Sequence, residues 1–247
     1  MIYEIAGLRI FIENKYEYTT KFCRGYLSSD QNSPATLVAR VTEEEFAEEK
    51  KLSPDFSDGY IENICLYRSI CRQIPVFRRM LLHGAVLEYG DKSYAFLGRS
   101  GTGKSTHTKL WKKYLSTPRM INGDKPILEY GEPFFTAYGT PWMGKEAWGC
   151  NAASPLCGLC FLEQAKENKI RRLTPSEVSA RLFGQILLPE DEENVVATLD
   201  LADMLIQKTP AYLLQCTISE EAVKLSFEQL TGLSYEENKY QGDKHEN

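Results

Sequence analysis

One glycine-rich segment constrains the fold of this chain more than any other feature. Residues 98–105 read Gly-Arg-Ser-Gly-Thr-Gly-Lys-Ser, which matches the G-x-x-x-x-G-K-[ST] pattern of a phosphate-binding loop. In that pattern the glycines turn backbone N–H groups toward phosphate oxygens, the lysine reaches the β- and γ-phosphates, and the last hydroxyl ligates Mg²⁺. We therefore predict nucleotide binding by Gly98, Ser100, Gly101, Thr102, Gly103, Lys104, Ser105 and Thr106.

The residues on either side of this segment favour the same interpretation. Residues 94–97 are a short apolar run that predicts a strand, and apolar residues recur at helical spacing after the loop, at Leu110, Trp111, Tyr114 and Leu115. The motif needs a strand before and a helix after, because the N-terminus of the helix adds partial positive charge to the phosphate site. ATP is the expected nucleotide, with GTP as the alternative, and Mg²⁺ is the expected metal.

A tight turn upstream of the loop narrows the fold class. Residues 82–90 predict a strand, and Gly90-Asp91-Lys92 joins it to the strand at 94–97. Two strands joined by so short a turn must be antiparallel, whereas the commonest folds with this loop are parallel around it. The sequence therefore predicts an α/β fold with a mixed sheet and flanking helices.

Three regions are expected along the chain: a small β-rich region at 1–57, a nucleotide-binding domain at 58–235 and a polar tail at 236–247. Residues 58–82 predict a helix, a break at Pro75 and a second helix. A hairpin is expected around Gly131-Glu132-Pro133, and further strands at 155–162, 170–173 and 211–216. Helix starts are expected at Thr42, Thr174 and Ser219, the first two with glutamate at capping-box spacing.

The order of these motifs resembles the catalytic domain of HPr kinase/phosphorylase. That family belongs to the P-loop branch shared with ATP-dependent phosphoenolpyruvate carboxykinases. The resemblance rests on Leu82-His83-Gly84, the predicted strand pair, the loop at 98–105 and the segment Asn122-Gly123-Asp124-Lys125. Residues 138–145 look still more like the smaller HPr-kinase-related proteins of bacteria, and the whole resemblance covers residues 60–235.

The resemblance implies site residues as well as a fold. In the family the His-Gly segment lies beside the phosphates, and an acidic pair after the loop serves metal binding and proton abstraction. This implies catalytic roles for Asp124, Lys104 and His83, and Mg²⁺ ligation by Ser105 and Asp124. The chain departs from the family at Gly123, where the first acidic residue is usual, and at Thr106, where glutamate is usual. We therefore expect a relative of HPr kinase rather than HPr kinase itself, and its oligomeric state stays open.

Three of the predicted site residues also have ordinary structural interpretations. Asp124 follows the short apolar pair Met120-Ile121 and precedes Lys125-Pro126, which is also the setting of a turn aspartate. His83 has the alternative of a hydrogen-bonded core histidine. Lys145 is a candidate for neutralising phosphate charge from a loop rich in glycine and proline, with a solvated loop lysine as the alternative.

Other residues are weaker candidates. Arg171 and Arg172 could supply positive charge, although arginines at a strand edge are usually solvated. Cys157 and Cys160 have metal-ligand spacing but lack a second pair, so buried strand cysteines are the preferred interpretation. Residues 195–200 end in Asp200 like the acidic strand of many P-loop proteins, but their apolar spacing predicts a helix.

Composition excludes several classes of protein. The net charge of −5 argues against a broad nucleic-acid surface, because such binding depends on Lys and Arg. No apolar run is long enough for a membrane span, and the N-terminus lacks the features of a signal peptide. The seven irregularly spaced cysteines favour reduced thiols, so we expect a cytoplasmic protein.

Two functions remain in competition from the sequence. The first is an ATP-binding, Mg²⁺-dependent kinase that transfers the γ-phosphoryl group to the hydroxyl of a protein or peptide serine or of a small metabolite. The second is a nucleotide-binding regulatory module without efficient phosphotransfer, which is motivated by Gly123 in place of a carboxylate. A carboxykinase is a distant third, because the chain has about half the length typical of that family.

Overall fold

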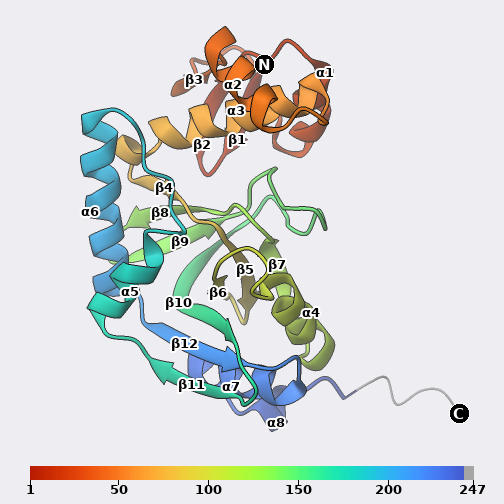
Figure 1. Cartoon of the computed structure of the whole chain (residues 1–247), viewed down its shortest axis with the longest axis vertical. Helices are drawn as coiled ribbons and strands as arrows, with labels where there is room; N and C mark the ends of the chain where they lie inside the picture. Colours follow the sequence, from red (N-terminus) through yellow and green to blue (C-terminus); the bar gives the residue numbers. More distant parts are fainter. Residues whose placement is uncertain (242–247) are drawn as a thin grey trace, which may run out of the picture.

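The structure, a computed structural model, describes residues 1–241. The elements in chain order are β1 (Ile2–Ile5), β2 (Leu8–Ile12), α1 (Glu17–Phe22), η1 (Arg24–Tyr26), β3 (Leu37–Ala39), α2 (Glu43–Leu52), α3 (Asp58–Gln73), η2 (Pro75–Phe77), β4 (Arg79–Leu81), β5 (Gly84–Tyr89), β6 (Lys92–Leu97), α4 (Lys104–Tyr114), β7 (Arg119–Asn122), β8 (Ile127–Gly131), β9 (Phe134–Tyr138), β10 (Ala153–Gln164), β11 (Lys169–Arg172), α5 (Pro175–Leu182), α6 (Glu192–Lys208), β12 (Ala211–Cys216), α7 (Glu220–Thr231) and α8 (Tyr235–Asn238). Figure 1 shows the first three strands and first three helices as an upper tier above a curled mixed sheet.

The upper tier is a three-stranded sheet packed against α3. β1 pairs antiparallel with β2, and β2 pairs parallel with β3. Ile5 and Ile10 of this sheet share one buried cluster with Ile70 of α3 and with Leu81 and Ile127 of the main body. The N-terminal tier is therefore joined to the rest of the molecule by a continuous apolar contact.

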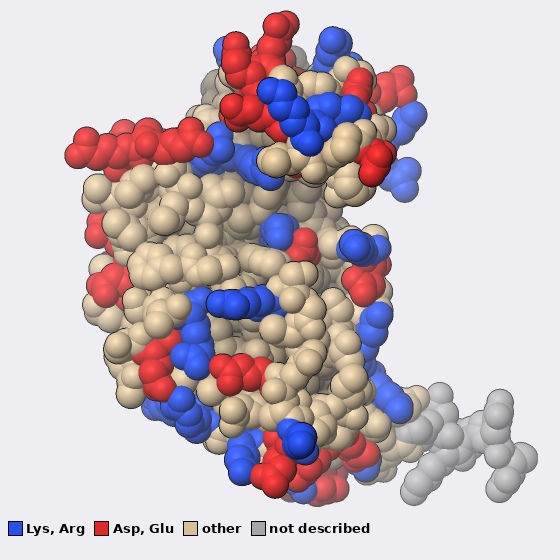
Figure 2. All heavy atoms as spheres, viewed as in Figure 1, with Lys and Arg blue, Asp and Glu red and all other residues tan. Residues whose placement is uncertain are grey.

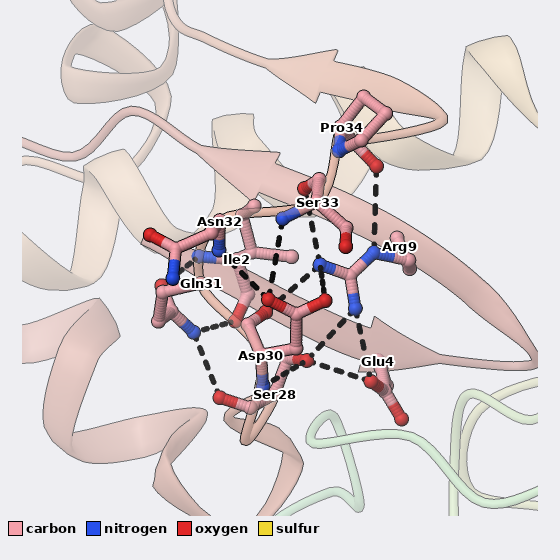
Figure 3. Close-up of polar contacts among 9 residues, drawn as sticks. All are labelled: Ile2, Glu4, Arg9, Ser28, Asp30, Gln31, Asn32, Ser33 and Pro34. Atoms are coloured by element: carbon pink, nitrogen blue, oxygen red, sulfur yellow. Dashed lines mark hydrogen bonds and ion pairs between the residues drawn. The ribbon is translucent and has the colours of Figure 1, made fainter.

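A polar network holds the loop that enters β3 (Figure 3). The guanidinium of Arg9 on β2 donates to the carbonyl oxygens of Asp30 at 2.8 Å and Ser33 at 3.1 Å, and to the hydroxyl of Ser28 at 3.1 Å. It also lies 3.3 Å from a carboxylate oxygen of Glu4. The N–H groups of the Arg9 guanidinium are therefore bound to groups of this loop and of β1, and these contacts stabilise the loop.

The main sheet is organised around one long strand. The strand order is β4-β8-β9-β10-β6-β5-β7, and β12 joins both β10 and β11. The start of β10 pairs antiparallel with β9, whereas its later residues pair parallel with β6 and with β12. β5 and β6 are antiparallel through the turn at Gly90, which confirms the predicted mixed sheet.

Alternation along β6 explains why helices cover both faces of the sheet. Tyr94 and Phe96 point into a cluster with Trp111 of α4 and Phe227 of α7. Ala95 and Leu97, which alternate with them along the strand, belong to a second cluster that contains residues of α5 and α6. Because successive strand residues face opposite sides, one apolar run supplies both halves of the core.

Several local predictions are confirmed. Thr42 and Thr174 each form a complete capping box, with Glu45 and Glu177, and the hydroxyl of Ser219 accepts from the third residue of α7. Residues 195–200 lie within α6. Within residues 1–241, no helix has the length and apolar character that crossing a bilayer requires.

The predicted second helix after Pro75 is wrong. The chain makes one 3-10 turn, passes through Arg78 in the left-handed region at φ 59°, and forms β4, which pairs antiparallel with β8. A run of three or four apolar residues suits a buried strand as well as a helix. Here the ion pair from Arg79 to Glu129, at 2.7 Å, ties the run to β8.

Candidate functional site

The glycine-rich loop (residues 98–103) joins the end of β6 to the start of α4. Gly101 and Gly103 have φ values of +82° and +103°, which side chains other than glycine rarely adopt. Gly103 occupies the N-cap position of α4 and supplies no side-chain acceptor. The first-turn N–H groups of α4 therefore remain available to an anion, because the first four donors of a helix have no partner within the helix.

α4 differs in this respect from the other long helices. Among helices of eight or more residues in the described chain, α2, α3, α5, α6 and α7 each begin with a side-chain cap, from Thr42, Ser57, Thr174, Asp191 and Ser219 respectively. Only α4 has no such cap. An uncapped N-terminus behind a glycine-rich loop has the donor geometry that a phosphate group can use.

Lys104 lies at the centre of this loop. Its side chain is buried, and Nζ donates to the carbonyl oxygens of Gly98 at 2.8 Å and Arg99 at 3.4 Å. Burial lowers the pKa of Lys104, while the negative charge of Asp124 acts to raise it. The ammonium is thus folded over the loop and lies within electrostatic range of the Asp124 carboxylate.

The hydroxyl residues predicted around the loop have different surroundings. Ser105 and Thr106 lie half-buried in the first turn of α4. Within residues 1–241, the hydroxyl of Ser105 forms no hydrogen bond. Thr102 donates to the Arg99 carbonyl at 2.9 Å and braces the loop, whereas Ser100 is exposed. Of the two half-buried hydroxyls, Ser105 occupies the position at which the motif pattern places the Mg²⁺ ligand.

Asp124 is positioned by an asparagine that the sequence analysis did not single out. Asn122, the last residue of β7, is fully buried, and its Oδ1 accepts from the backbone N–H of Asp124 at 2.9 Å and of Lys125 at 2.7 Å. Its Nδ2 donates to the carbonyl of Thr140 at 3.1 Å. The Asn-Gly-Asp tripeptide was the available signal, because asparagine side chains commonly bond to the backbone two residues on.

Two basic side chains face the Asp124 carboxylate. Nε2 of His83 is 3.3 Å from Oδ1, and Nζ of Lys125 is 3.3 Å from Oδ2. Burial would raise the pKa of Asp124, but the hydrogen bond from His83 and the charge of Lys125 outweigh it, so the pKa lies below its ordinary value. The carboxylate is therefore ionised at neutral pH, as a metal ligand or a proton acceptor must be.

His83 lies between β4 and β5 and is only partly buried. Its backbone N–H donates to the carbonyl of Gln185 at 2.6 Å, while its side chain, 30% exposed, lies beside Asp124. The structure thus brings His83, Asp124 and Lys104 to one edge of the main sheet. Their catalytic roles stay predictions.

The segment 139–150 closes over Asp124 with its backbone. A Cβ on Gly144 would lie 3.0 Å from the Cβ of Asp124, so the backbone at Gly144 lies in close contact with the Asp124 side chain. Lys145 is exposed, and within residues 1–241 it forms no hydrogen bond or ion pair. The next residue, Glu146, lies 3.5 Å from Lys109 of α4. Lys145 therefore follows a residue that lies beside Asp124, but within residues 1–241 it forms no hydrogen bond or ion pair with the glycine-rich loop.

Gly123 stands in a position that excludes a larger side chain. A Cβ there would lie 2.9 Å from the carbonyl oxygen of Met143 and 3.1 Å from that of Trp148. The backbone N–H of Gly123 also donates to the Trp148 carbonyl at 2.8 Å. A carboxylate at this position would require segment 139–150 to move.

The weaker candidates lie elsewhere or serve the core. Arg171 forms a two-point contact with Glu177, at 3.1 Å and 2.6 Å, and Asp200 is exposed on α6. Cys160 is buried in β10. His107 is buried on α4, its Nε2 lies 3.0 Å from Oγ of Ser226, and burial lowers its pKa to about 3.

A magnesium ion at this site would have to be bound mainly through phosphates. In the part of the chain that the structure covers, no group of three or more His, Cys, Asp or Glu could hold a metal ion. Mg²⁺ in nucleotide sites typically takes one or two protein oxygens and completes its shell with phosphate and water. Ser105 and Asp124 could supply those two oxygens.

The surface of the molecule carries charges of both signs. Figure 2 shows acidic and basic side chains interspersed over the visible face, and a hollow between the N-terminal tier and the main body.

Comparisons with known proteins give only distant structural resemblances. No protein-family model and no curated protein sequence matches the chain. Among solved structures, it is similar to the Hpr(Ser) kinase/phosphatase from Coxiella burnetii, with a TM-score of 0.26 and 11% identity over 51% of this chain and 88% of that one. A likeness this distant carries no argument about residues or activity.

Proposed function

We propose that this protein is an ATP-dependent, Mg²⁺-requiring phosphotransferase that passes the γ-phosphoryl group to a hydroxyl. The acceptor would be a serine of a protein or peptide, or the hydroxyl of a small metabolite. GTP is the alternative donor. A cytoplasmic location follows the reduced-thiol interpretation of the cysteines.

One observation supports the proposal above all others. The uncapped N-terminus of α4, the buried ammonium of Lys104 and the ionised carboxylate of Asp124 converge at one edge of the sheet. Phosphoryl transfer needs little covalent chemistry from the protein, and it depends on positioned phosphates and neutralised charge. Each of the three groups suits one of these needs.

The residues divide the work as follows. The loop amides and Lys104 would hold the phosphates, and Ser105 with Asp124 would hold Mg²⁺, which neutralises charge on the phosphate oxygens. A bond forms between the acceptor oxygen and the γ-phosphorus, while the bond from that phosphorus to the β–γ bridging oxygen breaks. The proton of the acceptor hydroxyl passes to the carboxylate of Asp124 or to His83, and the nucleoside diphosphate leaves with the bridging electrons.

A second function, nucleotide binding without efficient transfer, stays in competition. Its support is that Asp124 faces two basic side chains at 3.3 Å rather than a second carboxylate. The close carbonyl contacts of Gly123 mean that a carboxylate at that position is not a clean test between the two functions.

The deciding experiment follows label from γ-labelled ATP. The protein is incubated with Mg²⁺, a desalted bacterial lysate and a pool of free hydroxy amino acids and sugars, and label is followed in the protein and small-molecule fractions. Asp124→Asn is compared with wild type. Asp200→Asn, the same change on exposed α6, is the matched control.

Label transfer that is lost in Asp124→Asn but kept in Asp200→Asn supports the kinase and identifies the class of acceptor. Nucleotide binding by the wild type without any movement of label favours the binding module. An absence of nucleotide binding by the wild type contradicts both functions.

A further inference from the structure

A hollow of about 320 Å³ lies against the outer side of the glycine-rich loop. The loop and the first turns of α4, including Thr106 and Leu110, form one wall. Gln164 at the end of β10 and the stretch from Cys216 to Ile218 after β12 form the other. Its volume is at the lower end of the range for small-molecule sites, about 300–1,000 Å³.

We infer that this hollow receives the nucleobase of the nucleotide whose phosphates the loop binds. The inference rests on the proposed function, because it assumes that Lys104 and the loop hold a nucleotide. It adds the residues that bind the base: Leu110, Gln164, Cys216 and Ile218.

The topology of the sheet separates the base from the site of transfer. β6, β10 and β12 are parallel neighbours, so the loop, Gln164 and Cys216 all leave the sheet at the same edge. β7 lies on the opposite side of β6, beyond β5, and it carries Asp124 at its end. A nucleotide is elongated, so a terminal phosphate directed toward Asp124 places its base toward β10 and β12. Ligands of α/β sheets commonly bind at the carboxyl ends of parallel strands.

The lining of the hollow suits an uncharged, flat group. Within residues 1–241, no Asp, Glu, Lys or Arg lines it, and burial lowers the pKa of His107 to about 3, so that side chain is neutral. Leu110 is partly exposed, and Ile218 at the rim is 78% exposed, which leaves apolar surface for a base to cover. Covering such surface is favourable because it removes apolar area from water.

Both walls are held in place by polar contacts. The side-chain amide of Gln164 donates to the carbonyl of Gly101 at 3.1 Å and so ties the loop to the end of β10. Asn168 accepts from the backbone N–H of Thr217 at 2.8 Å and fixes the start of the turn that carries Ile218. The hollow is therefore formed by braced segments before any ligand arrives.

A larger hollow, of about 700 Å³, lies in the N-terminal tier and has a different character. Glu13, Lys15, Arg40 and Glu62 line it, and the carboxylate of Glu62 already accepts from the backbone N–H of Lys15 at 2.6 Å. It does not border the glycine-rich loop. The smaller, uncharged hollow is therefore the one that fits the base.

Cys216 offers a direct test, because its half-buried thiol lines the hollow while the partly exposed Cys157 lies outside it. The wild-type protein is treated with N-ethylmaleimide for fixed times, alone or with Mg²⁺ and ATP, GTP or inorganic tripolyphosphate. Modification of each cysteine is measured by peptide mass spectrometry. Binding of each compound is measured in parallel by calorimetry.

We expect ATP or GTP to slow modification of Cys216 at least tenfold and to leave Cys157 unchanged, and the more protective nucleotide identifies the preferred base. Tripolyphosphate, which has no base, should bind without protecting Cys216. A nucleotide that binds without protecting Cys216, or equal protection by tripolyphosphate, overturns the inference and leaves the proposed function standing. Failure of every compound to bind overturns the proposed function and the inference with it.

A second measurement does not depend on thiol reactivity. Ile218→Asn changes an exposed side chain, so the fold should be retained. We expect it to weaken nucleotide binding at least fivefold without changing tripolyphosphate binding, whereas Leu233→Asn, at another exposed apolar residue that lies outside the hollow, should change neither. Equal nucleotide affinity in wild type and Ile218→Asn overturns the inference.

Discussion

His83 and Asp124 lie side by side, with Nε2 of the imidazole 3.3 Å from Oδ1 of the carboxylate. One residue precedes the glycine-rich loop, and the other follows α4 and β7. They meet because β5 pairs with both β6 and β7, so the start of β5 lies beside the end of β7. The backbone N–H of Gly84 also donates to the carbonyl of Asp124 at 3.0 Å, which fixes the two segments together.

This pair predicts non-additive losses of phosphoryl transfer. Asp124→Asn should lower kcat by about 10²- to 10⁴-fold, the usual contribution of a positioned acid–base group. His83→Gln should lower it less, and the double variant should be no worse than Asp124→Asn, because the imidazole acts on the same proton or carboxylate. Single-turnover rates with labelled ATP measure all three variants. Independent, multiplying losses would contradict a shared role.

Lys104 is predicted to serve nucleotide binding at no cost to folding. Lys104→Met keeps the length of the stem but removes the ammonium, so ATP affinity should fall by about 2–3 kcal/mol, roughly 30- to 150-fold. The melting temperature should not decrease, because a buried charge with a pKa lowered by burial is removed. Lys109→Met, at an exposed position on the same helix, is the control. Equal ATP affinity in the Lys104 and Lys109 variants would exclude the phosphate role.

Gly123 is predicted to be required for packing. Gly123→Ala places a Cβ 2.9 Å from the Met143 carbonyl, so the free energy of unfolding should fall by about 1–3 kcal/mol, as for other overpacked sites. Gly131→Ala, where nothing lies within 4 Å of the added Cβ, should have little effect. Urea denaturation compares the two. Gly123→Asp should likewise lose stability without gaining transfer activity, and a stable, more active Gly123→Asp would show that segment 139–150 yields easily.

His107 is predicted to make stability depend on pH. Burial lowers its pKa from 6.5 to about 3, so the unfolded chain takes up a proton near pH 6.5 that the folded chain does not. Its contribution to stability is therefore intact above pH 6.5 and decreases as the pH falls toward 3. Between pH 7 and pH 5 the loss amounts to about 2 kcal/mol.

The measurement is denaturant unfolding of wild type and His107→Gln at both pH values. Glutamine does not titrate and can still reach the Ser226 hydroxyl, so the variant should lose less stability between pH 7 and pH 5 by about that amount. The same pH dependence in both proteins would mean that folding does not lower the pKa of His107.

The predictions of the capping boxes and of the tight turn at Gly90 are confirmed. The capping boxes at Thr42 and Thr174 form as the sequence indicates, because each links residues three apart in one helix turn. The turn at Gly90 sets the antiparallel β5–β6 pair for the same reason. The helix predicted over the residues of β4 is wrong, because the conformation of this segment depends on its pairing with β8, which lies far along the chain. Short apolar runs adopt the structure of the partner they find.

The sequence by itself determined the glycine-rich loop, the lysine and serine after it, and the capped starts of α2, α5 and α7, since these features act between neighbours in the chain. Tertiary structure alone decided that His83 meets Asp124, that Asn122 orients that aspartate, and that segment 139–150 leaves no room beside Gly123. It also formed the hollow between the loop and the ends of β10 and β12. Such contacts depend on strand order and on the close packing of distant segments, which no local pattern of residues encodes.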